Sequence, residues 1–444
     1  MAISARRLTG VLGVLMISSV AIVACQSDGD IKEERPPAPA TAAPSGDTDV
    51  SATLAPTSVL APTARSTSPP NPTSTPIPTP AQSPALPAPP VLNRDIHSVD
   101  LKDIVFDRFD GSTTRLSAAS NALIDRLRDA IKPIYSAQYD DVSGGEWLTP
   151  DDTILGYVSD DGQAYAYPIK FLNFHELIND VIDGVPLLVT YCPLCASGVV
   201  FDRRVDGEAL IFGNTSALYN SDLVMFDYAS GSYWFQTGGE AIVGPMTGTR
   251  LTPLPSSVLA WSDWTELHPT TKILSRDQGL GTRESQYLQD PFSTYADFIN
   301  GGDNRYPFPV NTELVGDSLR PAEVVIAVAI NGSERAYPPA RIGDAAVNDE
   351  IGGEPVIVFS RETGPVATVF SPFIGGRQLD FEFANGSFTD VQTGSTWNMG
   401  GAATSGELEG TRLTPLPSRR AFWFTISISN PDIEVYGRQE IIAP

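Results

Sequence analysis

The sequence predicts an α+β fold that is predominantly antiparallel β-sheet and is built as two tandem homologous lobes. Two observations lead to this prediction. The nine residues GTRLTPLPS occur at 248–256 and again, unchanged, at 410–418, and a repeat of this length indicates an internal duplication. Around both copies, most local patterns are short apolar runs bounded by glycine or turn residues, which is typical of β-strands.

Residues 1–25 have the pattern of an export signal. Arg6 and Arg7 precede an apolar run that begins at Leu8 and ends in Ala24-Cys25, as in the charged and hydrophobic regions of a signal peptide. The run is slightly short for a bilayer span, and a small residue precedes the cysteine, which favours a lipoprotein signal over a transmembrane anchor. We therefore predict lipidation at Cys25 and attachment to the extracytoplasmic face of the cell membrane.

Residues 26–92 have the composition of a disordered tether. They hold 16 of the 38 prolines, many alanines, threonines and serines, and no aromatic residue. Such a segment cannot bury enough apolar surface to offset the entropy lost on ordering. We expect it to hold residues 93–444, which is length enough for about two domains, away from the membrane.

Charge and composition exclude several classes of function. The formal net charge is −24, and residues 1–92 carry only five basic and six acidic side chains, so nearly all of it belongs to the folded part. This excess of acid repels phosphate backbones, which argues against a nucleic-acid partner. Three cysteines exclude a disulfide-dense scaffold, and three histidines leave little material for a histidine-rich metal site.

Residues 93–151 form a lead-in to the first repeat. An amphipathic helix is predicted between 116 and 131, because four apolar residues there recur at helical spacing. These residues are Leu123, Ile124, Leu127 and Ile131.

The two copies extend well beyond the shared nine residues. Alignment around them places the first repeat at 152–276, a connecting segment at 277–321, and a second, degenerate repeat at 322–438. Two units of this length that share an ancestor are expected to share a fold.

An aspartate and a tryptophan recur at equivalent places in the two repeats. Asp227 and Trp234 of the first repeat align with Asp390 and Trp397 of the second. We interpret the two tryptophans as core residues. Arg250 recurs as Arg412. The two arginines are expected to make an inter-lobe or turn contact, with Asp227 and Asp390 as the candidate partners.

Each repeat should be mostly strand. In the first repeat, 184–192 (GVPLLVTYC) is an apolar run opened by glycine, and 198–213 (GVVFDRRVDGEALIFG) has the pattern of a hairpin that turns at Asp206-Gly207. The Asn179-Asp180 pair, which recurs in the second repeat, is predicted to form a turn.

Two short helices are predicted in the first repeat. Phe171, Phe174, His175 and Ile178 lie at helical spacing. A second helix is expected near 261–267, where a proline soon after the end prevents its continuation.

Differences between the copies locate a candidate site in the first repeat. Cys192 and Cys195, the two cysteines outside the signal, have no cysteine counterparts in the second repeat, and His175 aligns with an aspartate. The first repeat also has six extra residues within 213–225. This pattern is expected if the first lobe holds a site and the second is structural, although drift in the second copy would produce it too.

These residues resemble a known family. The runs NFHELINDVIDGVPLLVTYCPLCASGVVFDRRVDG (173–207) and YNSDLVMFD (219–227) closely resemble the domain of unknown function family numbered 3179. That family is bacterial and archaeal, often exported or lipid-anchored, and is identified by its Cys-Pro-Leu-Cys signature. The resemblance implies no particular chemistry. It carries over these motif positions: His175, Asn179, Asp180, Tyr191, Cys192, Cys195, Asn220, Ser221, Asp222, Met225 and Trp234.

The Cys-x-x-Cys pair at a strand end predicts thiol-based redox or soft-metal chemistry. Two sulfurs at this spacing can close a disulfide or bind a metal ion. With His175, and with the thioether of Met225, Cys192 and Cys195 would form a soft ligand set for copper. Two cysteines and one histidine with a water molecule would also suit a catalytic zinc. We therefore name Cys192, Cys195 and His175 as candidate catalytic residues and add Met225 as a candidate metal ligand.

Three other interpretations stay open at this point. Cys192 could act as a nucleophile with His175 as its base, in acyl transfer at the cell envelope. The protein could be a non-enzymatic binding module at the cell surface that uses the extra residues of the first repeat. Cys192 and Cys195 could also form a structural disulfide, which oxidising compartments favour.

Overall fold

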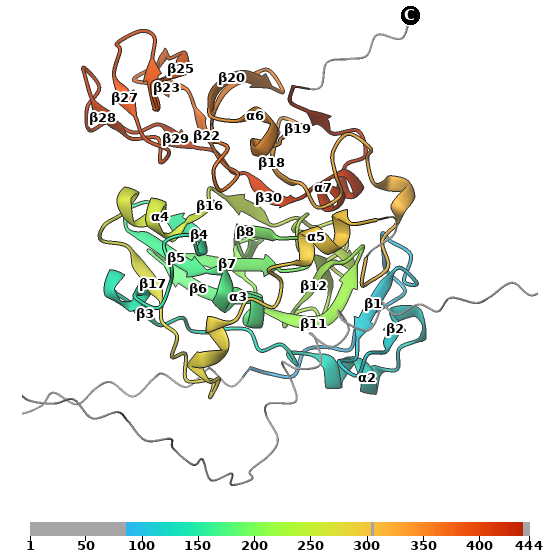
Figure 1. Ribbon diagram of the computed structural model, residues 1–444. Coiled ribbons are helices and arrows are strands. Elements are labelled where there is room, and N and C mark those ends of the chain that lie inside the picture. The colour runs from blue at the N-terminus through green and yellow to red at the C-terminus, as the bar shows by residue number, and fades with distance from the viewer. Residues whose placement is uncertain (1–85, 303–305, 438–444) are drawn as a thin grey trace, which may run out of the picture. The chain divides into compact units, whose positions relative to one another are not determined.

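The computed structural model describes residues 86–302 and 306–437 (Figure 1). The predicted signal, residues 1–25 with Cys25, lies outside the described residues. The predicted tether lies outside them as far as residue 85. Leu92 is 5 % exposed and packs in a hydrophobic cluster with the lead-in. The packed chain therefore begins slightly before the boundary that we predicted.

The described chain is mostly antiparallel β-sheet, as predicted. A five-stranded sheet of the first lobe has the order β16-β4-β5-β17-β3. Its strands are β3 (Tyr139–Asp140), β4 (Thr153–Val158), β5 (Ala164–Pro168), β16 (Ser257–Ala260) and β17 (Lys272–Leu274). The β17–β5 pair is parallel, and the other pairs are antiparallel.

A six-stranded sheet joins the lead-in to the first lobe, in the order β14-β13-β12-β11-β1-β2. Its strands are β1 (Ile104–Asp107), β2 (Thr113–Arg115), β11 (Phe212–Tyr219), β12 (Asp222–Asp227), β13 (Tyr233–Phe235) and β14 (Glu240–Val243). Apolar residues of the lead-in pack against this sheet in one core cluster. The lead-in is therefore an integral part of the first lobe.

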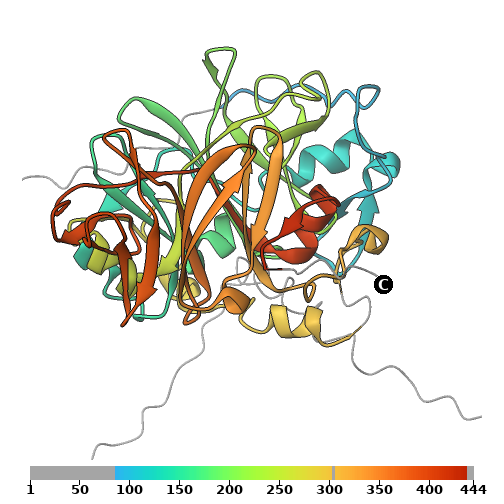
Figure 2. The same ribbon diagram turned by 90° about the horizontal axis from the view of Figure 1, so that it is seen from above.

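An eight-stranded sheet runs through both lobes. Its order is β31-β19-β18-β30-β8-β7-β6, with β15 paired to β8. The first lobe supplies β6 (Leu177–Ile182), β7 (Val185–Cys192), β8 (Ser197–Asp202) and β15 (Thr252–Leu254), and the second supplies β18 (Val324–Ile330), β19 (Ser333–Tyr337), β30 (Arg419–Phe422) and β31 (Glu434–Val435). The lobes meet where β30 bonds to β8, with Arg420 opposite Gly198. In Figure 2 the orange and red strands of the second lobe lie in front of the green first lobe.

Two four-stranded sheets complete the second lobe. One has the order β20-β21-β22-β29, and the other has the order β25-β26-β27-β28. Their strands are β20 (Ala345–Ile351), β21 (Glu354–Arg361), β22 (Val366–Ser371), β25 (Phe381–Ala384), β26 (Ser387–Asp390), β27 (Thr396–Trp397), β28 (Ala403–Ser405) and β29 (Thr414–Pro415). Two small hairpins stand apart, β9 (Arg204–Val205) with β10 (Glu208–Ala209) and β23 (Phe373–Ile374) with β24 (Arg377–Gln378).

Helices are short. The α-helices are α2 (Asn121–Leu127), α3 (Ile169–His175), α4 (Trp261–Leu267), α5 (Tyr295–Asn300), α6 (Pro339–Ile342) and α7 (Trp423–Ser429). The 3-10 helices are η1 (Leu116–Ala118), η2 (Val142–Gly145), η3 (Glu284–Leu288) and η4 (Thr312–Leu314). Within 86–302 and 306–437, no helix has the length and apolar character needed to cross a membrane.

The predicted helices are present, but two are shorter than expected. The amphipathic segment divides into η1 and α2 because the hydroxyl of Ser120 accepts a hydrogen bond from Leu123 N, which starts a new helix at 121. The helix after β5 ends at His175, so Ile178 lies in a strand instead. The helix at 261–267 is confirmed.

The Asn179-Asp180 pair does not form a turn, contrary to our prediction. It lies within β6, and the turn follows at Asp183-Gly184. The Asn179 side chain donates to Phe212 O and accepts from Phe212 N, both at 2.8 Å. Asn348 makes the same pair of bonds to Phe381. This asparagine recurs because it fixes the base of a hairpin.

The expected contact between Arg250 and Asp227 is also wrong. Arg250 is exposed and pairs with Glu240. Asp227 is buried, and its Oδ2 accepts a 3.0 Å hydrogen bond from the indole Nε1 of Trp234. A buried carboxylate needs a nearby donor, and the neighbouring tryptophan supplies one.

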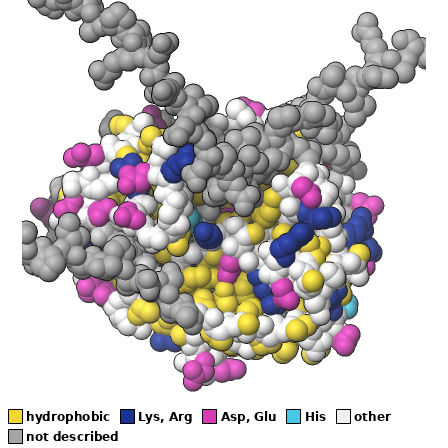
Figure 3. All heavy atoms as spheres, turned by 90° about the horizontal axis from the view of Figure 1, so that it is seen from below, with side chains coloured by type: hydrophobic (Ala, Val, Ile, Leu, Met, Phe, Trp, Pro, Cys, Tyr) yellow, Lys and Arg dark blue, Asp and Glu magenta, His cyan; other side chains and the backbone are white. Residues whose placement is uncertain are grey.

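One face of the molecule carries charged side chains of both signs (Figure 3). Figure 3 shows one face, where hydrophobic side chains gather in a patch bordered by acidic and basic ones. On this face the acidic excess is therefore mixed with basic groups.

Candidate functional site

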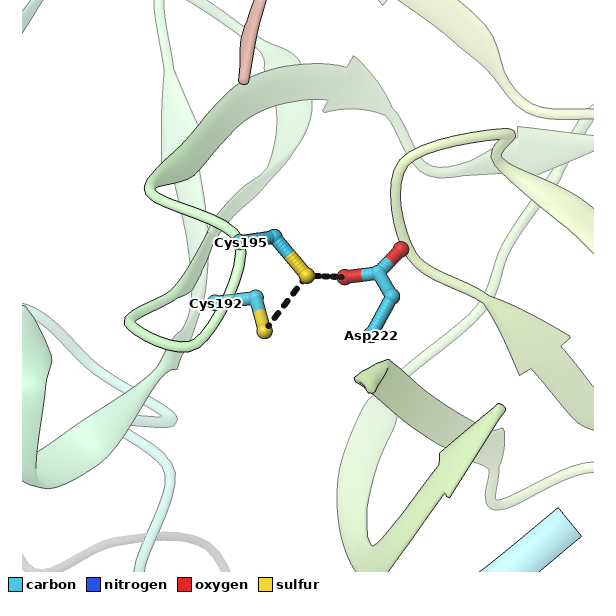
Figure 4. Close-up of side chains that lie close together, drawn as sticks. All are labelled: Cys192, Cys195 and Asp222. Atoms are coloured by element: carbon cyan, nitrogen blue, oxygen red, sulfur yellow. Dashed lines mark hydrogen bonds between the residues drawn. The ribbon is translucent and has the colours of Figure 1, made fainter. Parts of the chain in front are cut away.

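The two cysteines lie at the tight connection between β7 and β8. Cys192 is the last residue of β7, and Cys195 N donates to Cys192 O at 3.2 Å. Ala196 has a left-handed φ of 48°, which turns the chain into β8. The two Sγ atoms consequently point toward each other, 3.4 Å apart, and both thiols are free and buried (Figure 4).

The tip of the β11–β12 hairpin meets these sulfurs. Tyr219 pairs with Asp222, so Asn220 and Ser221 form a two-residue turn, with φ values of 50° and 62°, as in a type I′ hairpin. Cys195 Sγ lies 3.2 Å from Ser221 O and 3.3 Å from Asp222 Oδ1 (Figure 4). The turn thus adds a carboxylate and a carbonyl oxygen to the two thiols.

The length of the β11–β12 hairpin makes this contact possible. The hairpin runs from Phe212 to Asp227, whereas the corresponding hairpin of the second lobe runs from Phe381 to Asp390. Its strands are therefore longer by six residues in total. The additional length carries Ser221 and Asp222 out to the cysteine loop.

The electrostatics of the site oppose negative charge. Burial raises the pKa of Cys192 and, more strongly, that of Cys195, and the nearby Asp222 raises both further. Burial also raises the pKa of Asp222, although hydrogen bonds from Thr237 act in the opposite direction. Reactive cysteines usually have depressed pKa values in electropositive, partly exposed surroundings. This pair has the opposite environment.

A second buried carboxyl, that of Glu176, lies near the site. It follows α3 with a left-handed φ of 57°, and its Oε2 accepts a 2.6 Å hydrogen bond from Asn214 Nδ2. Burial raises its pKa to about 8, and the charge of Asp222 contributes to this rise. Sequence reasoning missed Glu176, although its place directly after His175 and its divergence from Ala345 in the second repeat were visible.

The structure does not bring His175 to the sulfurs. Its Nδ1 is bonded to Lys132 O at 2.8 Å, and its Nε2 to the Tyr287 hydroxyl at 2.7 Å. Burial lowers the pKa of His175 to about 4, so the ring is neutral at pH 7. The donor atoms that lie within 4.8 Å of one another belong to Cys192, Cys195 and Asp222. His175 instead ties α3 to the connecting segment.

Met225 lies in the same hydrophobic cluster as Cys192 and Cys195 and is fully buried. It sits on β12, opposite Trp234 of β13. Its surroundings are those of a core methionine.

The second lobe also contacts the cysteine loop. Phe422 N donates to Cys195 O at 2.8 Å, and Arg420 donates to Ala196 O at 3.0 Å. Both donors belong to β30, so a strand from the far end of the chain fixes the loop. The sequence does hold one indication of Arg420, because this residue aligns with Val258 and so differs between the two copies.

Two further polar side chains border the thiols. Tyr295 of α5 belongs to the same hydrophobic cluster, and the hydroxyl of Thr425 in α7 acts to lower the pKa of Cys195. The Tyr295 hydroxyl forms no hydrogen bond within the described residues. The sequence gives no indication of either residue, because both come from segments outside the first repeat.

Comparison with known proteins gives one match. The family model described as "Protein of unknown function (DUF3179)" matches residues 128–432. No curated protein and no solved structure matches the chain.

Proposed function

The chain belongs to the DUF3179 family of proteins of unknown function, and we propose from its own site that Cys192, Cys195 and Asp222 bind a metal ion of the zinc class. The observation that carries this proposal is the convergence of two thiols and a carboxylate. Their donor atoms lie within 4.8 Å of one another and come from two separate hairpins.

The distances agree with shared coordination. Zinc binds sulfur at about 2.3 Å and carboxylate oxygen at about 2.0–2.2 Å, so tetrahedral ligands of these types lie roughly 3.5 Å apart. The Sγ–Sγ distance is 3.4 Å, and Cys195 Sγ lies 3.3 Å from Asp222 Oδ1. Small side-chain rotations would suffice to coordinate an ion.

Charge supports a cation at this place. Burial raises the pKa values of Cys192, Cys195 and Asp222, because each would be a buried anion when ionised. A bound divalent ion would stabilise all three anions and displace the thiol protons, as metal binding to thiols generally does. The same environment disfavours a reactive redox pair.

The donor set favours zinc over copper. Cu(I) prefers thiolate and thioether ligands, whereas zinc accepts thiolate and carboxylate together. The third donor of this site is the carboxylate of Asp222. Since His175 is bonded elsewhere, the predicted set of two cysteines and one histidine would require its ring to leave two hydrogen bonds.

The test is metal content of the full chain, purified without oxygen after reduction. We expect about one zinc per chain, and loss of it in Cys192→Ser and Cys195→Ser. Cys25→Ser is the matched control, since it removes the third cysteine and should keep the metal. No bound metal in the reduced wild-type chain, or equal metal in Cys192→Ser, would overturn the proposal.

A structural disulfide is the second candidate, favoured by the 3.4 Å Sγ–Sγ distance and by the predicted export signal. It predicts an intact mass that rises by two hydrogens on reduction. It also predicts a reduced chain that binds no metal, which separates it from the first candidate.

We also propose that the chain is a lipoprotein attached at Cys25 to the extracytoplasmic face of the membrane. The supporting pattern is the charged and apolar run that ends at Cys25. Incorporation of labelled fatty acid into wild type, and its absence in Cys25→Ser, is the expected result. Equal labelling of both would contradict it.

We also propose that the two lobes arose by internal duplication. Its support is the identical nine-residue segment together with two recurring contacts. The Trp234–Asp227 bond has its counterpart in Trp397–Asp390, also at 3.0 Å, and the asparagine that fixes the hairpin base recurs as described above.

A further inference from the structure

The backbone carbonyl oxygen of Ser221 lies among the donors of the proposed metal site. It is 3.2 Å from Cys195 Sγ and 3.9 Å from Cys192 Sγ, and it accepts hydrogen bonds from both thiols. The carboxylate oxygen Asp222 Oδ1 lies 3.3 Å from Cys195 Sγ. The carbonyl oxygen is therefore as close to this sulfur as the carboxylate is.

The four donor atoms have the spacing of a single coordination shell. Tetrahedral ligands of zinc lie roughly 3.5 Å apart, because each is about 2.0–2.3 Å from the ion. The two Sγ atoms are 3.4 Å apart, and the two oxygens lie 3.2 Å and 3.3 Å from Cys195 Sγ. Cys192, Cys195, Ser221 and Asp222 are all buried. An ion among them would have four protein donors.

We propose that the carbonyl oxygen of Ser221 is the fourth metal ligand, so that the site is a closed structural centre. Zinc sites that act in catalysis have three protein ligands and keep the fourth position for water or substrate, whereas structural sites are closed by four. On binding, the two thiol protons leave to solvent, and the hydrogen bonds from the thiols to Ser221 O give way to a metal–oxygen bond. This inference rests on the proposed metal function.

Two side-chain bonds hold the turn that carries this carbonyl. Asn220 Oδ1 accepts a hydrogen bond from Asn311 N at 3.0 Å, and Ser221 Oγ donates to Phe308 O at 3.1 Å. Asn311 and Phe308 both belong to the connecting segment between the repeats. The direction of the carbonyl is therefore fixed by contacts outside the set of metal donors, which favours a preformed ligand.

Ser221 has a backbone conformation that favours glycine. Its φ is 62°, and the corresponding turn position in the β25–β26 hairpin of the second lobe is Gly386, with a φ of 81°. A side chain at positive φ costs free energy, and such strain is most common at functional sites. What serine adds over glycine here is the hydroxyl that bonds to Phe308 O and so anchors the turn.

The first test asks whether the shell is closed. It uses the full chain, reduced and loaded with Co(II), whose visible spectrum reports on its ligands, and azide as the probe. We expect azide to leave the spectrum of wild type unchanged. Asp222→Ala removes one donor, and its cobalt spectrum should change with a saturable dependence on azide, which shows that the probe can reach the ion. A saturable change in wild type would overturn the inference.

The second test identifies the carbonyl. The full chain is made by cell-free synthesis with serine that carries ¹³C at the carbonyl carbon, and infrared spectra are compared before and after zinc is added. Coordination weakens a C=O bond, so one labelled carbonyl band should move to lower frequency. Ser221→Gly should bind zinc as wild type does, because glycine favours positive φ and keeps the carbonyl, but it should lack the shifted labelled band.

Ser262→Ala is the matched control, since it removes an exposed serine of α4 and should keep the shifted band. A shifted band that persists in Ser221→Gly would overturn the inference, as would zinc binding by wild type without any shifted band. Both results would leave the site of two cysteines and one aspartate in place. Failure of the reduced wild-type chain to bind Co(II) or zinc would overturn the metal site itself.

Discussion

Cys195 Sγ lies 3.3 Å from Asp222 Oδ1, although the two residues belong to different hairpins of the first lobe. The cysteine comes from the β7–β8 connection and the aspartate from the start of β12. Neither hairpin would bring a thiol and a carboxylate together alone. The contact exists because the β11–β12 hairpin is longer than the corresponding hairpin of the second lobe.

Asp222→Asn should lower zinc affinity by more than about 100-fold, which exceeds the usual effect of removing an outer-shell partner. The amide keeps the size of the carboxyl but cannot supply an anionic oxygen. Competition with a chromophoric chelator would measure the change. Asp180→Asn, at a half-buried carboxyl of β6 in the same lobe, is the control, and equal loss of affinity in both variants would argue against direct coordination by Asp222.

His175→Gln should leave metal content unchanged and lower the free energy of unfolding by about 1–3 kcal/mol, because the bridge between Lys132 O and the Tyr287 hydroxyl is weakened. Urea unfolding and metal analysis of the same sample would show this. A loss of bound metal would restore His175 as a ligand.

The pH dependence of His175 follows from its depressed pKa of about 4. The unfolded chain takes up a proton below about pH 6.5, whereas the folded chain does not until about pH 4. Its contribution to stability is therefore present above pH 6.5 and is lost as the pH falls toward 4. In His175→Gln, urea midpoints should fall less steeply over this range than in wild type.

The contribution of Glu176 to stability depends on pH in the opposite direction. Its pKa is about 8 in the folded chain, against 4.5 for the ordinary side chain, so the folded state holds an extra proton between these values. Stability of the metal-free protein should decrease as the pH rises from 4.5 to 8, by at most about 5 kcal/mol for this group. Glu176→Gln should flatten that decrease, whereas exposed Glu208→Gln should not. A decrease as steep in Glu176→Gln as in wild type would contradict the assignment.

Trp234→Phe and Trp397→Phe should destabilise the protein by similar amounts, about 1.5–3 kcal/mol each from the lost hydrogen bond to a carboxylate. Each indole donates at 3.0 Å to a buried aspartate, Asp227 or Asp390. Chemical denaturation of the two variants side by side is the measurement. A negligible cost at one position would show that the recurring contact has different roles in the two lobes.

Local pattern predicted much of the fold. The helix at 261–267 and the strand that ends at Cys192 depend on apolar spacing and on a following proline or turn, and both are found. The prediction of a turn at Asn179-Asp180 is wrong, although both residue types are common in turns, because a distant partner determines the structure of this pair. Its role in β6 depends on Phe212, 33 residues further along the chain.

The candidate site was predictable only in part, since its members come from three regions of the chain. The cysteines and the longer hairpin were visible as differences between the repeats. Which side chain would meet the sulfurs was not, because His175 is closer to the cysteines in sequence than Asp222 is, and only the tertiary structure shows that its ring bonds to Lys132 and Tyr287 instead. Tyr295 and Thr425 follow only from tertiary packing.

The junction of β30 with β8 also affects the order in which the protein can form. Arg420 and Phe422 bond to the connection that carries Cys195, more than 220 residues earlier in the chain. Contacts over such sequence separations are late and slow to form. The cysteine loop therefore reaches its final geometry only after almost the whole chain has been synthesised, and a chain truncated before residue 419 would leave that loop without two of its hydrogen-bond donors.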